Sequence, residues 1–221
     1  MHHSEFLCSR LPRFSLPPIG RYRIGAVSDV EGARTIDLMP GHMELALFEI
    51  EILEAGGREK LDYAVQTLLK EARSAYDVVL IDCPPGVTSL TMHWLEYADH
   101  FLPPTTPNYL GIRGLAVTTR LRERFDRERR HFAPSIGTLI TLDSDTPAEK
   151  RAKQEIIARD EAARLVPFPR QIPRLATIQR SAEYHLEMRS FAAKYPRTPK
   201  HDVPRIIKEL AVETVKRIAK T

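Results

Sequence analysis

Glycine and cysteine are scarce in this sequence, and no long apolar run is present. Ten glycines among 221 residues leave few positions for a loop whose backbone N–H groups close around phosphate. The two cysteines, Cys8 and Cys83, lack the spacing of metal ligands, which favours a reduced, cytoplasmic chain. No apolar run approaches the length of a membrane span, and no apolar segment follows Met1 as it would in a secretory signal.

The remaining composition is that of a globular protein. Charged residues make up 28% and hydrophobic residues 43%, and 221 residues suffice for one α/β domain with a sizeable core. The eight histidines are scattered and form no His-Glu-x-x-His pattern. A net charge of +4 and a pI near 9.1 allow an acidic partner without requiring one.

The most informative segment runs from Asp77 to Gly86. Its four apolar residues, Val-Val-Leu-Ile, are typical of a buried parallel strand, and they end at Asp82. Open α/β sheets bind their ligands at the carboxyl ends of strands, where an acid can hold Mg²⁺ or orient a water. The alternative is a core strand whose last residue happens to be acidic.

Strand and helix patterns alternate along the chain, which predicts an α/β fold with a mostly parallel sheet and helices on both faces. An apolar stripe at helical spacing predicts a helix over 61–72, and Thr146-Pro147-Ala148-Glu149 predicts a helix start with a capping box. Residues 1–22 are predicted to be a tail and 23–221 one domain. The other expected strands are 35–39, 100–103, 136–142 and 165–168, and the other expected helices are 42–54, 114–132 and 202–219.

Several segments in the same order resemble ParA-type partition ATPases, a group with a deviant Walker A loop that includes the MinD-like proteins. Tyr-Asp-Val-Val-Leu-Ile-Asp-Cys-Pro-Pro-Gly at 76–86 is similar to the second strand of their phosphate site. The resemblance covers roughly 35–221 and is also carried by 36–41, 104–115, 137–141, 166–170 and 174–176. It implies a P-loop NTPase-like fold with ATP and Mg²⁺ as cofactors.

The resemblance also implies roles for individual residues. Asp82 would be the catalytic Walker B acid, acting on Mg²⁺ directly or through water. Pro169 and Arg170 would line the base end of the nucleotide site, although an ordinary strand-exit turn explains them nearly as well. Thr141 is a further candidate, although a strand threonine usually packs or bonds to backbone. The loop that senses the γ-phosphate would contain Pro84, Pro85 and Gly86.

The defining loop of that family is missing from this sequence. Phosphate binding needs Gly-x-x-x-x-Gly-Lys-Ser/Thr, and the nearest match, Gly20 to Gly25, is followed by Ala26 and Val27 and is interpreted as chance. The sequence therefore predicts a domain incomplete at its N-terminus, which alone neither binds nor hydrolyses ATP at a useful rate. Apolar faces meant for the missing strand would be uncovered, so weak stability or self-association is expected.

Two functions from different classes remain. The first is an incomplete ParA-like ATPase of plasmid or chromosome partition, which by resemblance would form a homodimer, bind non-specific DNA and respond to a ParB-like partner. The second is a non-catalytic interaction module that binds DNA, a partner protein or a membrane surface. Arginines over 120–130 and basic residues over 194–220 are candidate phosphate contacts, with a solvated charged face as the alternative. A membrane-binding last helix is less favoured, because its apolar face lacks Trp and Phe.

Overall fold

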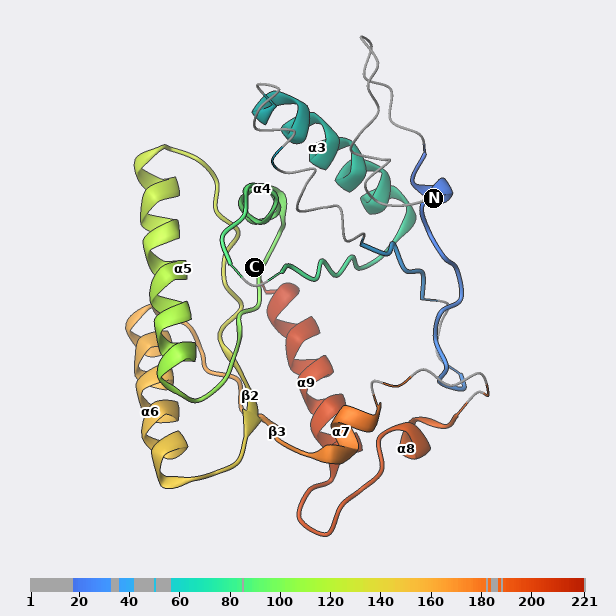
Figure 1. Ribbon diagram of the computed structural model, residues 1–221, viewed down its shortest axis with the longest axis vertical. Helices are drawn as coiled ribbons and strands as arrows, with labels where there is room; N and C mark the ends of the chain where they lie inside the picture. Colours follow the sequence, from blue (N-terminus) through green and yellow to red (C-terminus); the bar gives the residue numbers. More distant parts are fainter. Residues whose placement is uncertain are drawn as a thin grey trace. The chain divides into compact units, whose positions relative to one another are not determined.

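The computed structural model describes residues 18–32, 36–41, 50, 57–84, 86–181, 183, 187 and 189–220. The chain forms two compact units. The predicted tail over 1–22 and single domain over 23–221 stay predictions. Unit 1 is Met1–Ser28 with Ala33–Ala98, and unit 2 is Asp29–Gly32 with Asp99–Thr221. The elements are η1 (Ile19–Arg21), α3 (Arg58–Ala75), α4 (Ser89–Tyr97), β1 (Pro104–Thr105), α5 (Tyr109–Arg127), β2 (Leu139–Asp143), α6 (Pro147–Ala162), β3 (Ile172–Pro173), α7 (Ala176–Ser181), α8 (Phe191–Lys194) and α9 (Val203–Ile218) (Figure 1).

The core of unit 1 is formed by α3 and α4. The apolar face expected for α3 is confirmed, because all six of its apolar residues are buried. Leu90 and Trp94 of α4 pack in the same cluster, and so does Tyr22, which lies within the predicted tail. The six buried α3 residues are Leu61, Ala64, Val65, Leu68, Leu69 and Ala72.

Unit 2 contains a three-stranded parallel sheet in the order β1-β2-β3. Pro104 pairs with Leu139 and Thr141 with Ile172. Helix α9 packs on one side of the sheet through Leu210, whereas α5 and α6 lie on the other side of β2 (Figure 1). The expected α/β class with parallel strands is thereby confirmed.

Helix starts in unit 2 follow their capping residues. Thr146 and Glu149 form the expected capping box, and α6 begins at Pro147. Helix α5 begins at Tyr109 rather than at 114, because the Asn108 side chain accepts a hydrogen bond from the Gly111 N–H at 2.9 Å. The cap therefore fixes the first turn before the amphipathic pattern becomes visible.

Four strand predictions are wrong. Of 100–103 the structure shows an isolated parallel bridge between Phe101 and Ser135, and β1 begins at Pro104. Residues 77–82 form no strand, and the side chains of Val78, Val79 and Leu80 are 61%, 42% and 87% exposed. A buried strand needs hydrogen-bonding neighbours, and none of the described residues pairs with this segment. Residues 165–168 are irregular, and the sheet instead uses β3. Of 35–39 the structure shows an isolated antiparallel bridge between Leu38 and Ile24, and the expected helix 42–54 lies almost wholly outside the described residues.

A polar contact fixes the bridge to the end of α3. The Asp37 carboxylate accepts a hydrogen bond from the Tyr76 hydroxyl at 2.7 Å and is paired with the Arg23 guanidinium. These two partners, Tyr76 first, hold the pKa of Asp37 below its usual range. Because the Asp37 pKa is lower in the folded than in the unfolded chain, this contact stabilises the fold above the unfolded value, near pH 4.

We expect the contribution of Asp37 to disappear as the pH falls through its folded-state pKa. Asp37→Asn should lower the urea midpoint relative to the parent chain at pH 7, and the two midpoints should converge in acid. Urea unfolding followed by Trp94 fluorescence at several pH values between 7 and 3 measures this. Asp77→Asn, at an exposed carboxyl in the same unit, is the control. A midpoint difference that persists unchanged at low pH would contradict the assignment.

Candidate functional site

Asp82 ends an extended segment that emerges from the C-terminus of α3. Its side chain is exposed, as are those of Cys83 and Pro84, whereas the preceding Ile81 packs against the core of unit 1. Although the Cys83 residue is exposed, neighbouring protein atoms partly desolvate its thiol, and this desolvation, followed by the Asp82 charge, raises the thiol pKa. A raised pKa makes this cysteine a poor nucleophile at neutral pH. The side chain of Ile81 therefore holds this segment against the core of unit 1, and the carboxylate of Asp82 lies in solvent.

The residues after Asp82 lead into the N-terminus of α4. Gly86 has φ +108° and open space where a Cβ would lie, a conformation that other residues rarely adopt. Thr88 caps α4 by accepting a hydrogen bond from the Thr91 N–H at 3.1 Å. Pro85 lies outside the described residues. Uncapped backbone N–H groups of a helix start and a glycine turn are the groups that bind phosphate oxygens in proteins.

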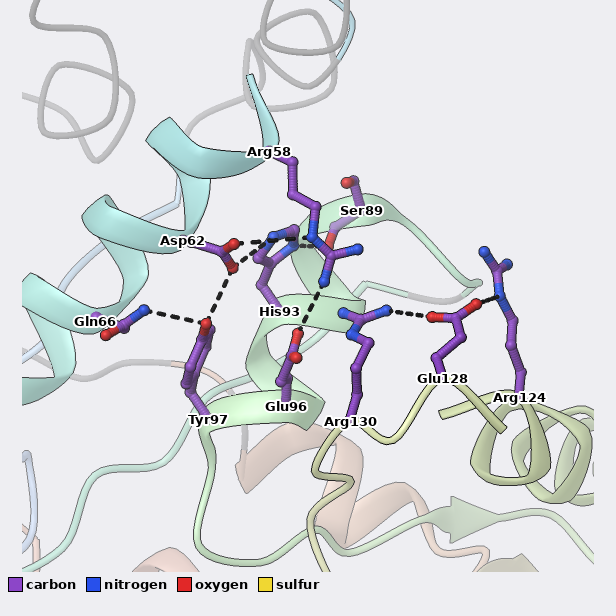
Figure 2. Close-up of polar contacts among 10 residues, drawn as sticks. All are labelled: Arg58, Asp62, Gln66, Ser89, His93, Glu96, Tyr97, Arg124, Glu128 and Arg130. Carbon is purple, nitrogen blue, oxygen red and sulfur yellow. Dashed lines mark hydrogen bonds and ion pairs between the residues drawn. The ribbon is translucent and has the colours of Figure 1, made fainter. Parts of the chain in front are cut away.

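A polar network clamps α4 to α3 and so fixes both ends of this segment. His93 is 2% exposed, and its Nδ1 donates to the Ser89 carbonyl at 2.6 Å. Its Nε2 lies 3.1 Å from Asp62 Oδ1, which also accepts a hydrogen bond from the Tyr97 hydroxyl at 3.1 Å (Figure 2). Gln66 donates to the same hydroxyl, and burial, with Asp62 second, raises the Tyr97 pKa. Sequence reasoning missed this network, because its members lie 31 to 35 residues apart across two helices.

A magnesium ion can be held at Asp82 only together with other ligands. Among the described residues no three His, Cys, Asp or Glu side chains cluster as a metal site would require. One exposed carboxylate fits Mg²⁺ in its usual setting, where nucleotide phosphates and waters supply most ligands. Asp82 is therefore suited to a metal that arrives with a nucleotide.

The remaining predicted site residues, Pro169 and Arg170 at the base end and Thr141 as a further candidate, belong to unit 2. Thr141 pairs with Ile172, which follows Pro169 and Arg170 closely in sequence. Pro169 is exposed. The Arg170 guanidinium, however, donates to Glu209 of α9 at 2.5 Å. In this structure Arg170 thus links the residues that precede β3 to α9. Its role in nucleotide binding stays a prediction.

The carboxyl end of β2 holds an ion-pair cluster that the sequence analysis did not identify. Lys153 of α6 donates to Asp143 at 2.8 Å and to Asp145 at 3.0 Å, and its side chain is only 12% exposed. These carboxylates raise the Lys153 pKa although burial opposes them. The backbone is left-handed at Leu142, φ 55°, and at Asp145, φ 58°. Two sequence features could have revealed this cluster. They are the run Asp-Ser-Asp at 143–145, where β2 ends, and a lysine two turns into a capped helix.

The glycines at 20 and 25 do not form a phosphate loop. Gly20 lies in η1, and Gly25 follows the isolated bridge at Ile24, with no strand before it and no helix after it among residues 18–32. A phosphate loop connects a strand to a helix N-terminus. The interpretation of this pair as chance agrees with the structure.

The charged helices combine internal ion pairs with exposed cations. Arg124 pairs with Glu128 at 2.8 Å, and Arg205 with Glu209 at 2.6 Å, both one helical turn apart. Arg130 also pairs with Glu128 (Figure 2). Both carboxylates have lowered pKa values, chiefly because of Arg124 and Arg205. Within the described residues, no helix combines the length and apolar character needed to cross a membrane.

Comparison with known proteins matches this arrangement to one family. The sequence model of the AAA domain family matches residues 16–133. The chain is 25% identical over 138 residues to the chromosome-partitioning ATPase Soj of Treponema pallidum, which covers 62% of this chain and 52% of that protein. The chain thus spans only about half of this relative's length, and a smaller share of others.

Two solved structures share the fold. Cobyrinic acid a,c-diamide synthase from Mycobacterium smegmatis, with a bound ATP analogue and magnesium, has a TM-score of 0.60 and 25% identity over 79% of this chain and 65% of that chain. The ATP complex of a Cyanothece McdA variant has a TM-score of 0.62 and 17% identity over 81% of this chain and 66% of that chain. With its parallel α/β sheet and more than half of its length matched by the AAA domain model, this chain belongs to the ParA/MinD-type P-loop ATPase family.

Proposed function

We propose that this chain forms the part of a ParA-type ATPase of plasmid or chromosome partition that follows the phosphate loop, with Asp82 as the acid beside Mg²⁺. One observation carries the proposal. An apolar extended segment, with Leu80 87% exposed, ends at an exposed carboxylate and continues through Gly86 into the capped start of α4. Exposed apolar side chains are unfavourable in water, so this segment needs a neighbouring strand. A parallel strand that bears the phosphate loop would satisfy that need and bring phosphate to Asp82.

In such an assembly the residues of this chain have distinct tasks. Asp82 accepts hydrogen bonds from waters of the metal or binds it directly, and bound Mg²⁺ neutralises charge on the nucleotide phosphates. We assign Pro84, Pro85 and Gly86 to the part of the chain that would sense the γ-phosphate. Arg170 would have to leave Glu209 before it could line the base end together with Pro169. Thr141 remains a further candidate for contact with the nucleotide.

We expect the chain alone to show no saturable, Mg²⁺-dependent ATP hydrolysis, because its sequence has no lysine-bearing phosphate loop. Fusing the strand–loop–helix segment of the Treponema Soj protein to its amino end should restore hydrolysis. Asp82→Asn in that fusion should lower the rate by about 100-fold, the usual cost of one transition-state electrostatic contact. Malachite-green phosphate release with and without EDTA measures both effects.

The matched control is Asp77→Asn, which removes an exposed carboxylate from the other end of the same segment. It should leave the rate of the fusion within about twofold, since surface substitutions away from special features have small effects. If the chain without the added segment hydrolyses ATP, the proposed need for a phosphate loop is wrong. If Asp82→Asn and Asp77→Asn behave alike in an active fusion, the assignment of Asp82 is wrong.

The second candidate function is a non-catalytic module that binds DNA phosphates. Exposed cations of α5 and α9, such as Arg120, Arg127 and Lys216, favour it, although internal ion pairs occupy Arg124 and Arg205. Binding through phosphate contacts must weaken steeply as salt rises.

Two binding experiments separate the possible partners of such a module. Binding of random-sequence DNA that needs no nucleotide and weakens with salt would favour a DNA-binding module. Flotation of the chain with anionic vesicles would instead favour binding of α9 to a membrane surface. A homodimer, a ParB-like partner and a cytoplasmic location belong to the first function as proposals.

A further inference from the structure

Residues 29–32 lie in unit 2, although the chain on both sides of them belongs to unit 1. Val30 forms a parallel bridge with Arg189, which lies between α7 and α8. The Glu31 N–H donates to the Arg189 carbonyl at 2.7 Å, and the Arg189 N–H donates to the Asp29 carbonyl at 2.9 Å. The segment is therefore held by its backbone in the manner of a short added strand, and we call residues 29–32 the strap.

A buried ion pair anchors the strap. The Lys194 ammonium donates to the Asp29 carboxylate, and the two side chains are only 9% and 8% exposed. Lys194 also donates to the Glu183 carbonyl at 3.2 Å, and its own carbonyl accepts a hydrogen bond from the Ser181 hydroxyl at 2.6 Å. An ammonium buried this deeply needs an anion beside it, because a buried charge without a partner is strongly unfavourable. In this structure the strap supplies that anion.

Other cations lie near the anchored lysine. Arg189, which pairs with the strap through its backbone, has an exposed side chain. Arg197 follows Lys194 by three residues and keeps 77% of its side chain exposed while it pairs with Asp202. Lys208 of α9 contacts α8, with its ammonium 5.3 Å from the centroid of the aromatic ring of that helix. The strap, which carries two carboxylates, therefore lowers the positive charge of this surface and covers its most buried cation.

We propose that the strap is an autoinhibitory element, in which the Asp29 carboxylate occupies a site at Lys194 that binds a DNA phosphate once the strap leaves. A carboxylate and a phosphate both present anionic oxygens that accept hydrogen bonds from ammonium and guanidinium groups. Release of the strap uncovers Lys194 and removes two negative charges from among the neighbouring cations. The proposal rests on the second candidate function, the binding of DNA phosphates, and adds a means of regulating it.

The small size of the strap decides which anions can displace it. The Arg189 bridge and the Lys194 ion pair both lie outside β1, β2 and β3, so the strap can leave without opening the sheet. Because the strap belongs to the same chain, its effective concentration at Lys194 is of about millimolar order, and a single free phosphate ion competes with it poorly. A DNA duplex presents many phosphates at once and gains further contacts with the neighbouring cations. We therefore expect duplex DNA, and not inorganic phosphate, to displace the strap.

Amide hydrogen exchange of the full chain reports this displacement directly. The Glu31 and Arg189 amides donate hydrogen bonds within the bridge, so both are protected while the strap is docked. Saturating random-sequence duplex at low salt should accelerate exchange of peptides that contain Glu31 by about fivefold or more, because bound DNA keeps the strap released. Inorganic phosphate at about 10 mM should leave this exchange unchanged.

A second measurement follows DNA affinity by fluorescence anisotropy. Asp29→Asn keeps the size of the side chain but removes its charge, so random-sequence duplex should bind about tenfold tighter, as expected where the strap is docked in about nine of ten parent molecules. The matched control is Glu161→Gln, which removes an exposed carboxylate from α6 and should change the affinity by about twofold or less. Lys194→Met removes the site itself, so Asp29→Asn added to it should give no further gain.

The outcomes separate the strap from the function on which it rests. A chain that binds no duplex in any variant would overturn the DNA-binding function and the strap together. Duplex binding without faster exchange of the strap, or equal affinities for Asp29→Asn and Glu161→Gln, would overturn the strap alone. Faster strap exchange with inorganic phosphate would overturn DNA as the occupant and assign the site to a free phosphate. The exchange measurement uses the parent chain, so it decides the question even where a variant fails to fold.

Discussion

Replacing Arg217 by alanine is expected to destabilise unit 2 by about 3–5 kcal/mol, the loss typical when one partner of a buried charged contact is removed. The Arg217 side chain is only 11% exposed. Its guanidinium donates to the carbonyls of Ile136 at 2.7 Å and Pro167 at 2.9 Å, and also to that of Val166. Its Nε pairs with Glu213 at 2.7 Å. Alanine removes the donor from all of these acceptors at once.

The ring of Phe168 adds to the cost. The guanidinium carbon lies 3.9 Å from the ring centroid, a close cation–π contact that alanine also loses. Arg217→Lys keeps the charge but not the planar donor array, so its effect should be intermediate. Lys216→Ala, an exposed neighbour on the same helix, should change stability by less than about 0.5 kcal/mol.

Hydrogen–deuterium exchange resolves this effect by unit. Peptides from β2 and α9 should exchange faster in Arg217→Ala, by the factor that corresponds to the lost stability. Trp94 lies in the core of unit 1, so its fluorescence reports that unit separately. Unchanged exchange in α9 and β2 would contradict the role of Arg217 as the link between α9 and the segments that lead into β2 and β3.

Arg217 also shows why only part of this fold follows from the sequence. The features that depend on local sequence were predicted correctly. The buried face of α3 depends on residue spacing within one helix, and the Thr146–Glu149 capping box depends on four consecutive residues. Within α9, by contrast, the apolar side chains of Val215 and Ile218 are 62% and 37% exposed. Arg217 takes the inner position because carbonyls 50 to 81 residues away in sequence accept its hydrogen bonds. Such distant acceptors leave no local trace.

The candidate site, like the fold, could be predicted only in part from the sequence. Asp82 was found because an apolar run before an acid is a local pattern, but the run is not a strand here, since pairing depends on a neighbour that none of the described residues provides. The contact of Arg170 with Glu209 and the Lys153 cluster both join separate elements. The propensity of a segment predicts what it can form, whereas its partners decide what it does form.

A second large effect is expected at Gly137, where alanine should cost about 2–4 kcal/mol, because strained φ values and overpacking each cost about 1–3 kcal/mol. Gly137 has φ +102°, which side chains with a Cβ rarely adopt. An added Cβ would lie 2.5 Å from Arg217 Nη1 and 2.8 Å from the Val166 carbonyl oxygen. Gly114→Ala is the control, because that helical glycine has open space around it, and it should stabilise α5 by about 0.5–1 kcal/mol.

Gly137 and Arg217 should be energetically coupled, because glycine leaves the space that the guanidinium occupies. In the double variant the Arg217 clash is gone, whereas the strain at φ +102° and the approach to Val166 remain. The double variant should therefore be more stable than the sum of the two single losses predicts, by about 1 kcal/mol, within the range seen for contacting residues. Guanidinium unfolding of the four chains, followed by exchange of the α9 peptides, measures this term. Strict additivity would show that Gly137 is needed for its backbone conformation and for the close approach of Val166, and not to admit Arg217.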